Sequence, residues 1–180
     1  SPNAIKRLST FHPERPMPKI FRLVKNGKLI EGVYEGETLN TPSMFCVADA
    51  LDSLMWIKEI GGLTETIRRS NENFKCLQGW VDKTPWIENL VSDPRNRSNT
   101  SVCLKFSDER LISLIPDEKT RFVKEFVGLL EVENAAFDIK GHRNAPPGLR
   151  IWCGATINLD DIQKLLPWLE YCFHEIISSY

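Results

Sequence analysis

The residues of this sequence best suited to bind an anion lie in a loop near the C-terminus. From position 141 the loop reads Gly-His-Arg-Asn-Ala-Pro-Pro-Gly-Leu-Arg. Gly141 has no side chain, so backbone N–H groups can come close to a ligand there. His142 adds a hydrogen-bond donor and Arg143 a fork-shaped cation, which suits phosphate or carboxylate. Composition alone favours a plainer interpretation, a surface turn with solvated charges.

A second arginine follows this loop within an apolar stretch. Arg150 lies between Leu149 and Ile151, which predicts a strand. Successive side chains of a strand point to opposite faces, so we expect Arg150 to point away from the face that its apolar neighbours share. A lone arginine in that position needs a partner or a cleft.

The segment Asn40-Thr41-Pro42 is the other candidate for anion binding. Thr41 is a suitable N-cap and Pro42 a suitable first residue of a helix. The free backbone N–H groups at such a helix start also attract phosphate. Capping alone is the usual role of such a segment, and phosphate binding is the second interpretation.

The remaining reactive residue types show no spacing that indicates catalysis or metal binding. His12 lies in a proline-rich segment without a nearby acid, and His174 falls in the last predicted helix. The five cysteines form no Cys-x-x-Cys pair, so we expect reduced core residues in a cytosolic protein and no metal site. The sequence also contains no Gly-x-Gly-x-x-Gly or P-loop motif.

Length and charge exclude several classes of protein. The chain has 180 residues with 23 Lys and Arg against 24 Asp and Glu, a net charge of -1. A general nucleic-acid-binding surface would need an excess of basic residues, which this balance argues against. No apolar run approaches the ~20 residues that span a bilayer, and the N-terminus shows no signal-peptide pattern. We therefore expect a cytoplasmic protein that binds neither nucleic acid nor membrane. Ser1 in place of an initiator Met suggests a chain that begins within a longer protein.

The elements that must position these residues predict an α/β fold. Short strands are expected at 20–24 and 29–33 around Asn26-Gly27, and helices at 42–60 and 63–80 around Gly61-Gly62. In the second of these helices Leu63, Ile67, Phe74 and Leu77 are expected to point inward. The order that follows is strand (101–106), helix (117–133), strand (136–139), strand (149–153) and helix (158–177, interrupted at Pro167). This order is typical of a sheet with one face covered.

These segments, taken in order, resemble the phosphoserine aminotransferases of the pyridoxal-phosphate fold type I superfamily. The Gly-His-Arg run with the following Gly-Leu-Arg carries the resemblance, together with the segment 40–44. Further matches lie at 28–32, 61–63, 83–87, 97–103 and 145–152, and together they cover nearly all 180 residues.

The resemblance implies an activity and a role for each candidate residue. The family uses pyridoxal 5'-phosphate to transfer an amino group between glutamate and 3-phosphohydroxypyruvate in L-serine biosynthesis, with phosphoserine and 2-oxoglutarate as the other substrates. Asn40 and Thr41 match positions that reach across a homodimer to the cofactor phosphate of the other subunit. His142 and Arg143 match the pair that holds the substrate phosphate. Arg150 matches the arginine that clamps the substrate carboxylate.

The sequence departs from the family's pattern in two ways. In the better-known bacterial branch, the gap between the loop arginine and the strand arginine is one residue shorter. The family's Schiff-base lysine, and the aromatic and aspartate that contact the cofactor ring, lie before the segment that matches Ser1. The chain should therefore carry no catalytic residue of its own and should be inactive alone.

The fold class implied is the C-terminal small domain of a fold type I aminotransferase plus the end of its large domain. Residues 1–41 would end the large domain, 42–83 would form connecting helices, and 84–180 would form the small domain. Two alternatives remain open. One is another fold type I aminotransferase of the serine or alanine–glyoxylate type, whose substrate would not need His142 and Arg143. The other is a non-catalytic truncated remnant.

Overall fold

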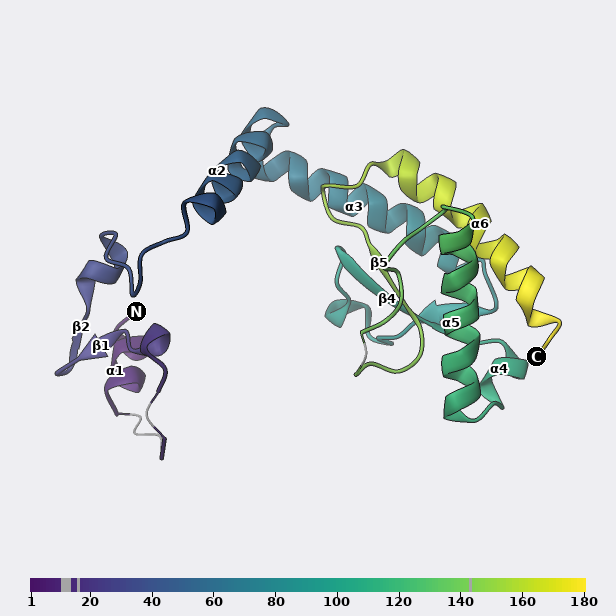
Figure 1. Ribbon diagram of the computed structural model, residues 1–180, viewed down its shortest axis with the longest axis horizontal. Coiled ribbons are helices and arrows are strands. Elements are labelled where there is room, and N and C mark those ends of the chain that lie inside the picture. The colour runs from purple at the N-terminus through teal and green to yellow at the C-terminus, as the bar shows by residue number, and fades with distance from the viewer. Residues whose placement is uncertain (11–13, 16, 143) are drawn as a thin grey trace. The chain divides into compact units, whose positions relative to one another are not determined.

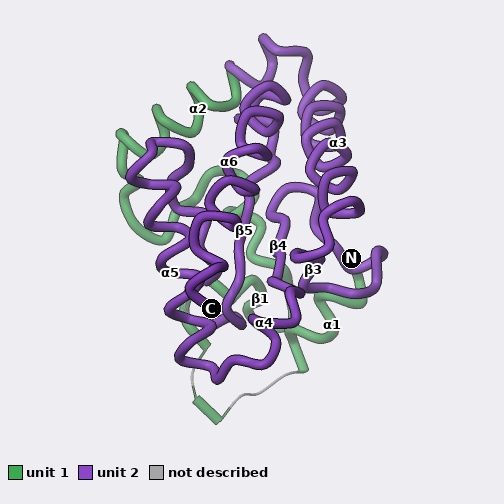
Figure 2. The backbone as a smooth tube through the Cα atoms, turned by 90° about the vertical axis from the view of Figure 1, so that its right-hand side faces the viewer, with its two compact units in different colours: residues 1–55 green, residues 56–180 purple. Residues whose placement is uncertain are grey.

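The computed structural model describes residues 1–10, 14–15, 17–142 and 144–180, which divide into two compact units (Figures 1 and 2). The first unit is Ser1–Met55, green in Figure 2, and the second is Trp56–Tyr180, purple. The boundary falls inside helix α2 (Met44–Glu59), within the segment predicted to connect two domains. The three-part division drawn from the sequence stays a prediction.

The first unit consists of short elements. Helix α1 (Pro2–Thr10) and the 3-10 turns η1 (Lys19–Phe21) and η2 (Glu31–Tyr34) surround a two-stranded hairpin. The hairpin pairs β1 (Val24–Lys25) with β2 (Lys28–Leu29), and its central residues Asn26 and Gly27 have φ angles of 52° and 73°. Positive φ at both positions matches the twist of paired strands. The predicted turn is therefore confirmed, although the strands are shorter than expected and α1 was not predicted.

Helix α2 begins later than the sequence analysis placed it. The backbone N–H of Cys46 donates to Ser43 Oγ at 3.5 Å, and that of Val47 to Ser43 O at 3.1 Å. Ser43 offers the same hydroxyl as Thr41 and stands directly before the first helical residue, so it caps the helix. The prediction of Thr41 as N-cap and Pro42 as first helical residue is therefore wrong.

The second unit is a three-stranded antiparallel sheet packed with three long helices. The strands are β3 (Ile87–Asn89), β4 (Ser101–Phe106) and β5 (Leu149–Trp152), in the order β3-β4-β5. Helices α3 (Gly62–Val81) and α5 (Pro116–Val132) both pack against α6 (Leu159–Ile177). The short helices η3 (Pro94–Asn96) and α4 (Glu109–Ile112) complete the unit. The α/β pattern predicted for this part of the chain is confirmed.

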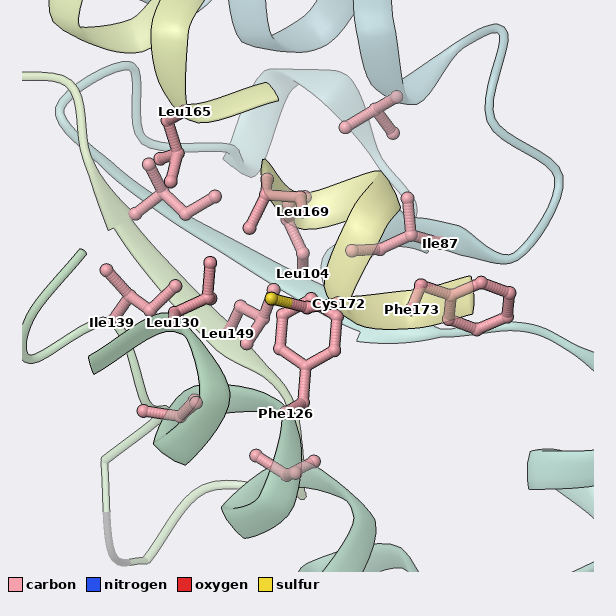
Figure 3. Packing of buried hydrophobic residues seen from close by; sticks show 14 of the residues in the cluster. Ile87, Leu104, Phe126, Leu130, Ile139, Leu149, Leu165, Leu169, Cys172 and Phe173 are labelled. Atoms are coloured by element: carbon pink, nitrogen blue, oxygen red, sulfur yellow. The ribbon is translucent and has the colours of Figure 1, made fainter. Parts of the chain in front are cut away.

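One face of the sheet joins the helices in a single hydrophobic core. Val102 and Leu104 of β4 are buried, while their neighbours in the strand are partly exposed. Phe126 of α5 points toward Leu149 of β5 and Cys172 of α6 (Figure 3). The alternation along β4 and the apolar face of α5 are thus those that the sequence predicts.

Three expectations about the second unit are wrong. Residues 136–139 form no strand, and only an isolated bridge joins Lys140 to Leu149. Pro167 does not interrupt α6, because buried residues on both sides of it hold the helix in the core. Leu63 and Ile67 are exposed, since the buried positions of α3 start at Ser70.

The cysteines only partly follow the prediction of reduced core residues. Cys153 and Cys172 are buried, whereas Cys46 is exposed on α2. Burial raises the pKa of Cys153 to about 12. Of the helices in the described ranges, none combines the length and apolar character that crossing a lipid bilayer requires.

Candidate functional site

Arg150 lies on the face of the sheet that is turned away from the hydrophobic core. Its neighbours Leu149 and Ile151 are both buried, while the Arg150 side chain is 38% exposed. Across the sheet Arg150 pairs with Cys103 of β4, a partly exposed residue that shares this face. The strand therefore presents the guanidinium outward, where a ligand can reach it.

A shallow depression of about 330 Å³ surrounds the Arg150 side chain. Two aromatic residues, Phe137 and Trp152, line it together with Ser101 and Asp138. The Trp152 indole N–H donates to Thr156 Oγ1 at 2.9 Å, which fixes the ring beside the arginine. An outward-facing guanidinium in such a depression is suited to bind a small carboxylate.

Asp138 is the acidic residue recorded next to Arg150 in the described part of the chain. Its Oδ2 lies 3.4 Å from Arg150 Nη2, and its side chain is 89% exposed. The backbone at Asp138 has a φ of 53°, in the left-handed region that Asp tolerates better than most residues. A single contact of this length leaves most of the guanidinium donors without a recorded partner among the described residues.

Backbone hydrogen bonds hold the segment 138–141 beside β5. The N–H of Arg150 donates to Ile139 O at 2.7 Å, and that of Gly141 to Gly148 O at 3.0 Å. A Cβ atom at Gly148 would come within 2.2 Å of the backbone oxygen of Leu104, so only glycine fits there. The base of this loop, at Gly141 and Gly148, is thus joined to the sheet.

His142 lies in this loop and lines a second depression of about 190 Å³. The backbone N–H of Asn144 donates to His142 Nδ1 at 3.2 Å. In the neutral ring an accepting Nδ1 leaves the proton on Nε2, so His142 can offer a donor to an anion. Lys140 lines the same depression and adds a positive charge. Arg143, predicted as the partner of His142, lies outside the described residues, as does His12.

The structure does not bring His142 and Arg150 into direct contact. No hydrogen bond or ion pair recorded for the described residues joins the two side chains, and they line different depressions. Consecutive residues of one segment line both depressions, because Ile139 contributes to the first and Lys140 to the second.

Asn40 and Thr41 belong to the first unit and are both exposed. They precede α2 without capping it, and no hydrogen bond of their side chains is recorded within the described residues. The Asn40 amide and the Thr41 hydroxyl are thus available as donors. Asn40 and Thr41 lie in the first unit and Arg150 lies in the second, so their geometry does not relate them to Arg150.

A buried asparagine in α3 supports the site and was not predicted. Asn73 is 1% exposed, and its Nδ2 donates to the backbone oxygens of Ile157 at 2.9 Å and Cys153 at 3.3 Å. These oxygens belong to the loop that follows β5. The signal in the sequence is a polar residue in line with Leu77 and Val81, at a helical spacing of four.

Comparison with known proteins identifies relatives of this chain. A phosphoserine aminotransferase of Methanosarcina mazei is 44% identical over 175 residues, which is 96% of this chain and 44% of that protein. One of Methanosarcina barkeri is 44% identical over 176 residues, 97% of this chain and 44% of that protein. The chain belongs to the phosphoserine aminotransferase family. It spans less than half the length of these curated relatives, and no protein-family model matches it.

Solved phosphoserine aminotransferases share the fold. The structure from Bacillus circulans subsp. alkalophilus matches with a TM-score of 0.68 at 21% identity, over 88% of this chain and 39% of that one. A pyridoxal-phosphate-bound phosphoserine aminotransferase from Trichomonas vaginalis matches with a TM-score of 0.66 at 21% identity, over 88% of this chain and 40% of that one. The predicted fold class, a part of a fold type I aminotransferase, is confirmed. The roles of the individual site residues stay predictions.

Proposed function

We propose that this chain is the C-terminal part of a pyridoxal-phosphate-dependent phosphoserine aminotransferase. The whole enzyme would transfer the amino group between glutamate and 3-phosphohydroxypyruvate, with phosphoserine and 2-oxoglutarate as the other substrates, in L-serine biosynthesis. The observation that carries the proposal is the 44% identity to phosphoserine aminotransferases over 96% of the chain. The outward guanidinium of Arg150, within an aromatic-lined depression, supports it.

Arg150 would bind the α-carboxylate that all four substrates share. A guanidinium offers parallel N–H donors that match the two oxygens of a carboxylate. The strand on which Arg150 lies is hydrogen-bonded on both sides, to β4 and to Ile139, so the arginine is presented from a rigid base. Such support keeps a substrate in one orientation, which transfer of an amino group to a defined atom requires.

His142 and Arg143 would bind the phosphate of phosphoserine. His142 has a donor available at Nε2, and Lys140 adds positive charge to the same depression. Phosphate carries about -1.5 to -2 charge at neutral pH, so it gains more from two or three cationic donors than a single carboxylate does. This pair would therefore distinguish phosphoserine from glutamate.

Asn40 and Thr41 would contact the phosphate of pyridoxal 5'-phosphate across a homodimer interface. The residues fit that role chemically, because an amide and a hydroxyl are both donors and both side chains are exposed. When bound, the pyridoxal group supplies the electron sink for moving the amino group. The lysine that links to it would lie in the segment that the longer relatives have and this chain lacks. The assembled enzyme would be a cytoplasmic homodimer.

The proposal is tested on the whole protein that contains this chain. Arg150→Lys should lower kcat/KM for phosphoserine and for glutamate alike, by about 10- to 100-fold, because lysine cannot form the paired hydrogen bonds. Arg143→Ala should lower kcat/KM for phosphoserine far more than for glutamate. Arg95→Lys, at an arginine whose side chain is 89% exposed, is the matched control and should change neither.

Two results would contradict the proposal. Equal losses of kcat/KM for both substrates in Arg143→Ala would contradict the phosphate-binding role of Arg143. If the whole protein formed no glutamate in the presence of phosphoserine, the proposed activity would be wrong. The chain of 180 residues should form no stoichiometric adduct with pyridoxal phosphate after borohydride reduction. An adduct on one lysine, mapped by digestion, would show that the chain holds the catalytic lysine after all.

A further inference from the structure

The Arg150 guanidinium lies beside a carboxylate of the chain itself. The Asp138 carboxylate lies 3.4 Å from the Arg150 guanidinium, at the edge of the depression where the substrate carboxylate is expected. Short charge-assisted hydrogen bonds of this kind measure about 2.7–2.9 Å, so the contact is loose. Asp138 is thus near enough to neutralise the arginine but does not saturate it.

The backbone keeps Asp138 in this place. The hydrogen bond from Arg150 N to Ile139 O, at 2.7 Å, joins the neighbouring residue to the strand, and the bridge between Lys140 and Leu149 continues the connection. The backbone of Asp138 therefore stays close to Arg150. It can leave only by rotating into solvent, where 89% of its side chain already lies.

We propose that Asp138 is a built-in counter-ion of Arg150, which the carboxylate of every substrate has to displace. This inference rests on the proposed function, because it takes Arg150 to be the carboxylate clamp. The geometry makes displacement easy, since a single loose contact competes with two parallel hydrogen bonds. Asp138 thereby weakens the binding of amino-acid and oxo-acid substrates equally.

The backbone conformation of Asp138 allows a clean substitution. Its φ of 53° lies in the left-handed region, which asparagine adopts as readily as aspartate. Asp138→Asn therefore removes the charge without disturbing the backbone or the shape of the side chain. Glu131→Gln is the matched control, because Glu131 is an exposed acid near the end of α5 with no ion pair recorded among the described residues.

The experiment measures the whole protein in two ways. Calorimetric titration with 2-oxoglutarate gives the dissociation constant without catalysis, and steady-state kinetics give kcat and kcat/KM for phosphoserine and glutamate. In Asp138→Asn the dissociation constant should fall, and kcat/KM should rise for both amino acids, by about two- to fivefold, the range expected for an exposed ion pair. The kcat value should stay constant, and Glu131→Gln should match the unmodified protein.

Two results would overturn the inference. Unchanged binding in Asp138→Asn would show that the contact has no effect on substrates. Weaker binding would show that Asp138 instead orients Arg150 for them. Both results differ from failure of the proposed function, in which the unmodified protein would not form glutamate from phosphoserine at all.

Discussion

The two units of the chain differ in how much of their structure they can stabilise alone. The second unit, Trp56–Tyr180, has a continuous hydrophobic core that includes side chains of all three strands and all three long helices. None of the described residues in the first unit, Ser1–Met55, is buried. Two-residue strands cannot exclude water from their hydrogen bonds. Arg150 is therefore positioned by a self-sufficient fold, whereas Asn40 and Thr41 need further protein to position them.

Hydrogen exchange on the 180-residue chain should show the largest difference between the units. The amides of β4 and α5 should open only with global unfolding, which slows exchange by about a thousandfold or more for a domain of ordinary stability. The amides of β1 and β2 should exchange almost as fast as in an unstructured peptide. If the amides of the hairpin were protected as strongly as those of β4, the first unit would be as stable as the second, contrary to what the burial of their residues indicates.

The reactivity of the cysteines also tests the difference in stability between the two units. Exposed Cys46 of the first unit should react at once with a thiol reagent at neutral pH, whereas buried Cys153 should react only as the second unit unfolds. Mass spectrometry of the labelled chain separates the two sites. Rapid labelling of Cys153 in native protein would mean that the core opens more easily than its burial suggests.

Alkaline pH should lower the free energy of unfolding of the second unit, because its buried thiols must stay protonated in the folded form. Burial raises the pKa of Cys153 to about 12 and that of Cys172 to about 11. A thiol in the unfolded chain ionises near pH 8.5, so the folded form keeps protons that the unfolded form loses. The stability from these buried thiols is complete below about pH 8.5 and is lost as the pH rises toward the folded values. Urea unfolding of the chain between pH 8 and pH 11 measures the decline, which Cys153→Ala should reduce.

Asn73 should show how strongly the loop after β5 depends on one buried side chain. Asn73→Ala removes donors from the backbone oxygens of Cys153 and Ile157 and should lower the free energy of unfolding by about 1–3 kcal/mol. Asn73→Asp keeps the shape but turns a carboxylate oxygen toward those oxygens, so its loss should be larger, about 3–5 kcal/mol. Urea denaturation measures both. A smaller loss for Asp than for Ala would show that the loop moves away to solvate the site.

The sequence could predict the local elements of the second unit better than the contacts between them. The strand at 101–106 and the helix at 117–133 follow from the alternation or periodicity of their own residues. The contacts of Asp138 with Arg150 and of Asn73 with Cys153 depend on segments 12 and 80 residues apart. No periodic pattern encodes such pairs, because they depend on how the segment 138–141 pairs with β5 and on the packing of α3.

The same limit explains the errors near the site. Residues 136–139 alternate well enough to predict a strand, but the positive φ at Asp138 prevents regular pairing there. Thr41 and Ser43 offer the same capping hydroxyl, and the choice between them depends on where the helix begins. Arg150 was placed correctly on the outward side of its strand, because the alternation of Leu149, Arg150 and Ile151 is a local property.

A matched pair of glycine substitutions tests the smallest expected effects, both within the second unit. Gly148→Ala would place a Cβ atom 2.2 Å from Leu104 O, and backbone cannot move aside as a flexible side chain can. It should lower the free energy of unfolding by about 1–3 kcal/mol, as overpacking in a core does, and should disturb the loop that carries His142. Gly128 lies inside α5 with nothing within 4 Å of an added Cβ. Gly128→Ala should therefore raise the free energy of unfolding by about 0.5–1 kcal/mol, since alanine loses less backbone entropy in a helix.

Thermal unfolding of the two variants beside the unmodified chain should shift the midpoint temperature in opposite directions if the base of the loop is as tightly packed as the structure shows. If Gly148→Ala were as stable as Gly128→Ala, the strand β4 and the loop would not approach each other so closely, and the rigid base inferred for Arg150 and His142 would be lost.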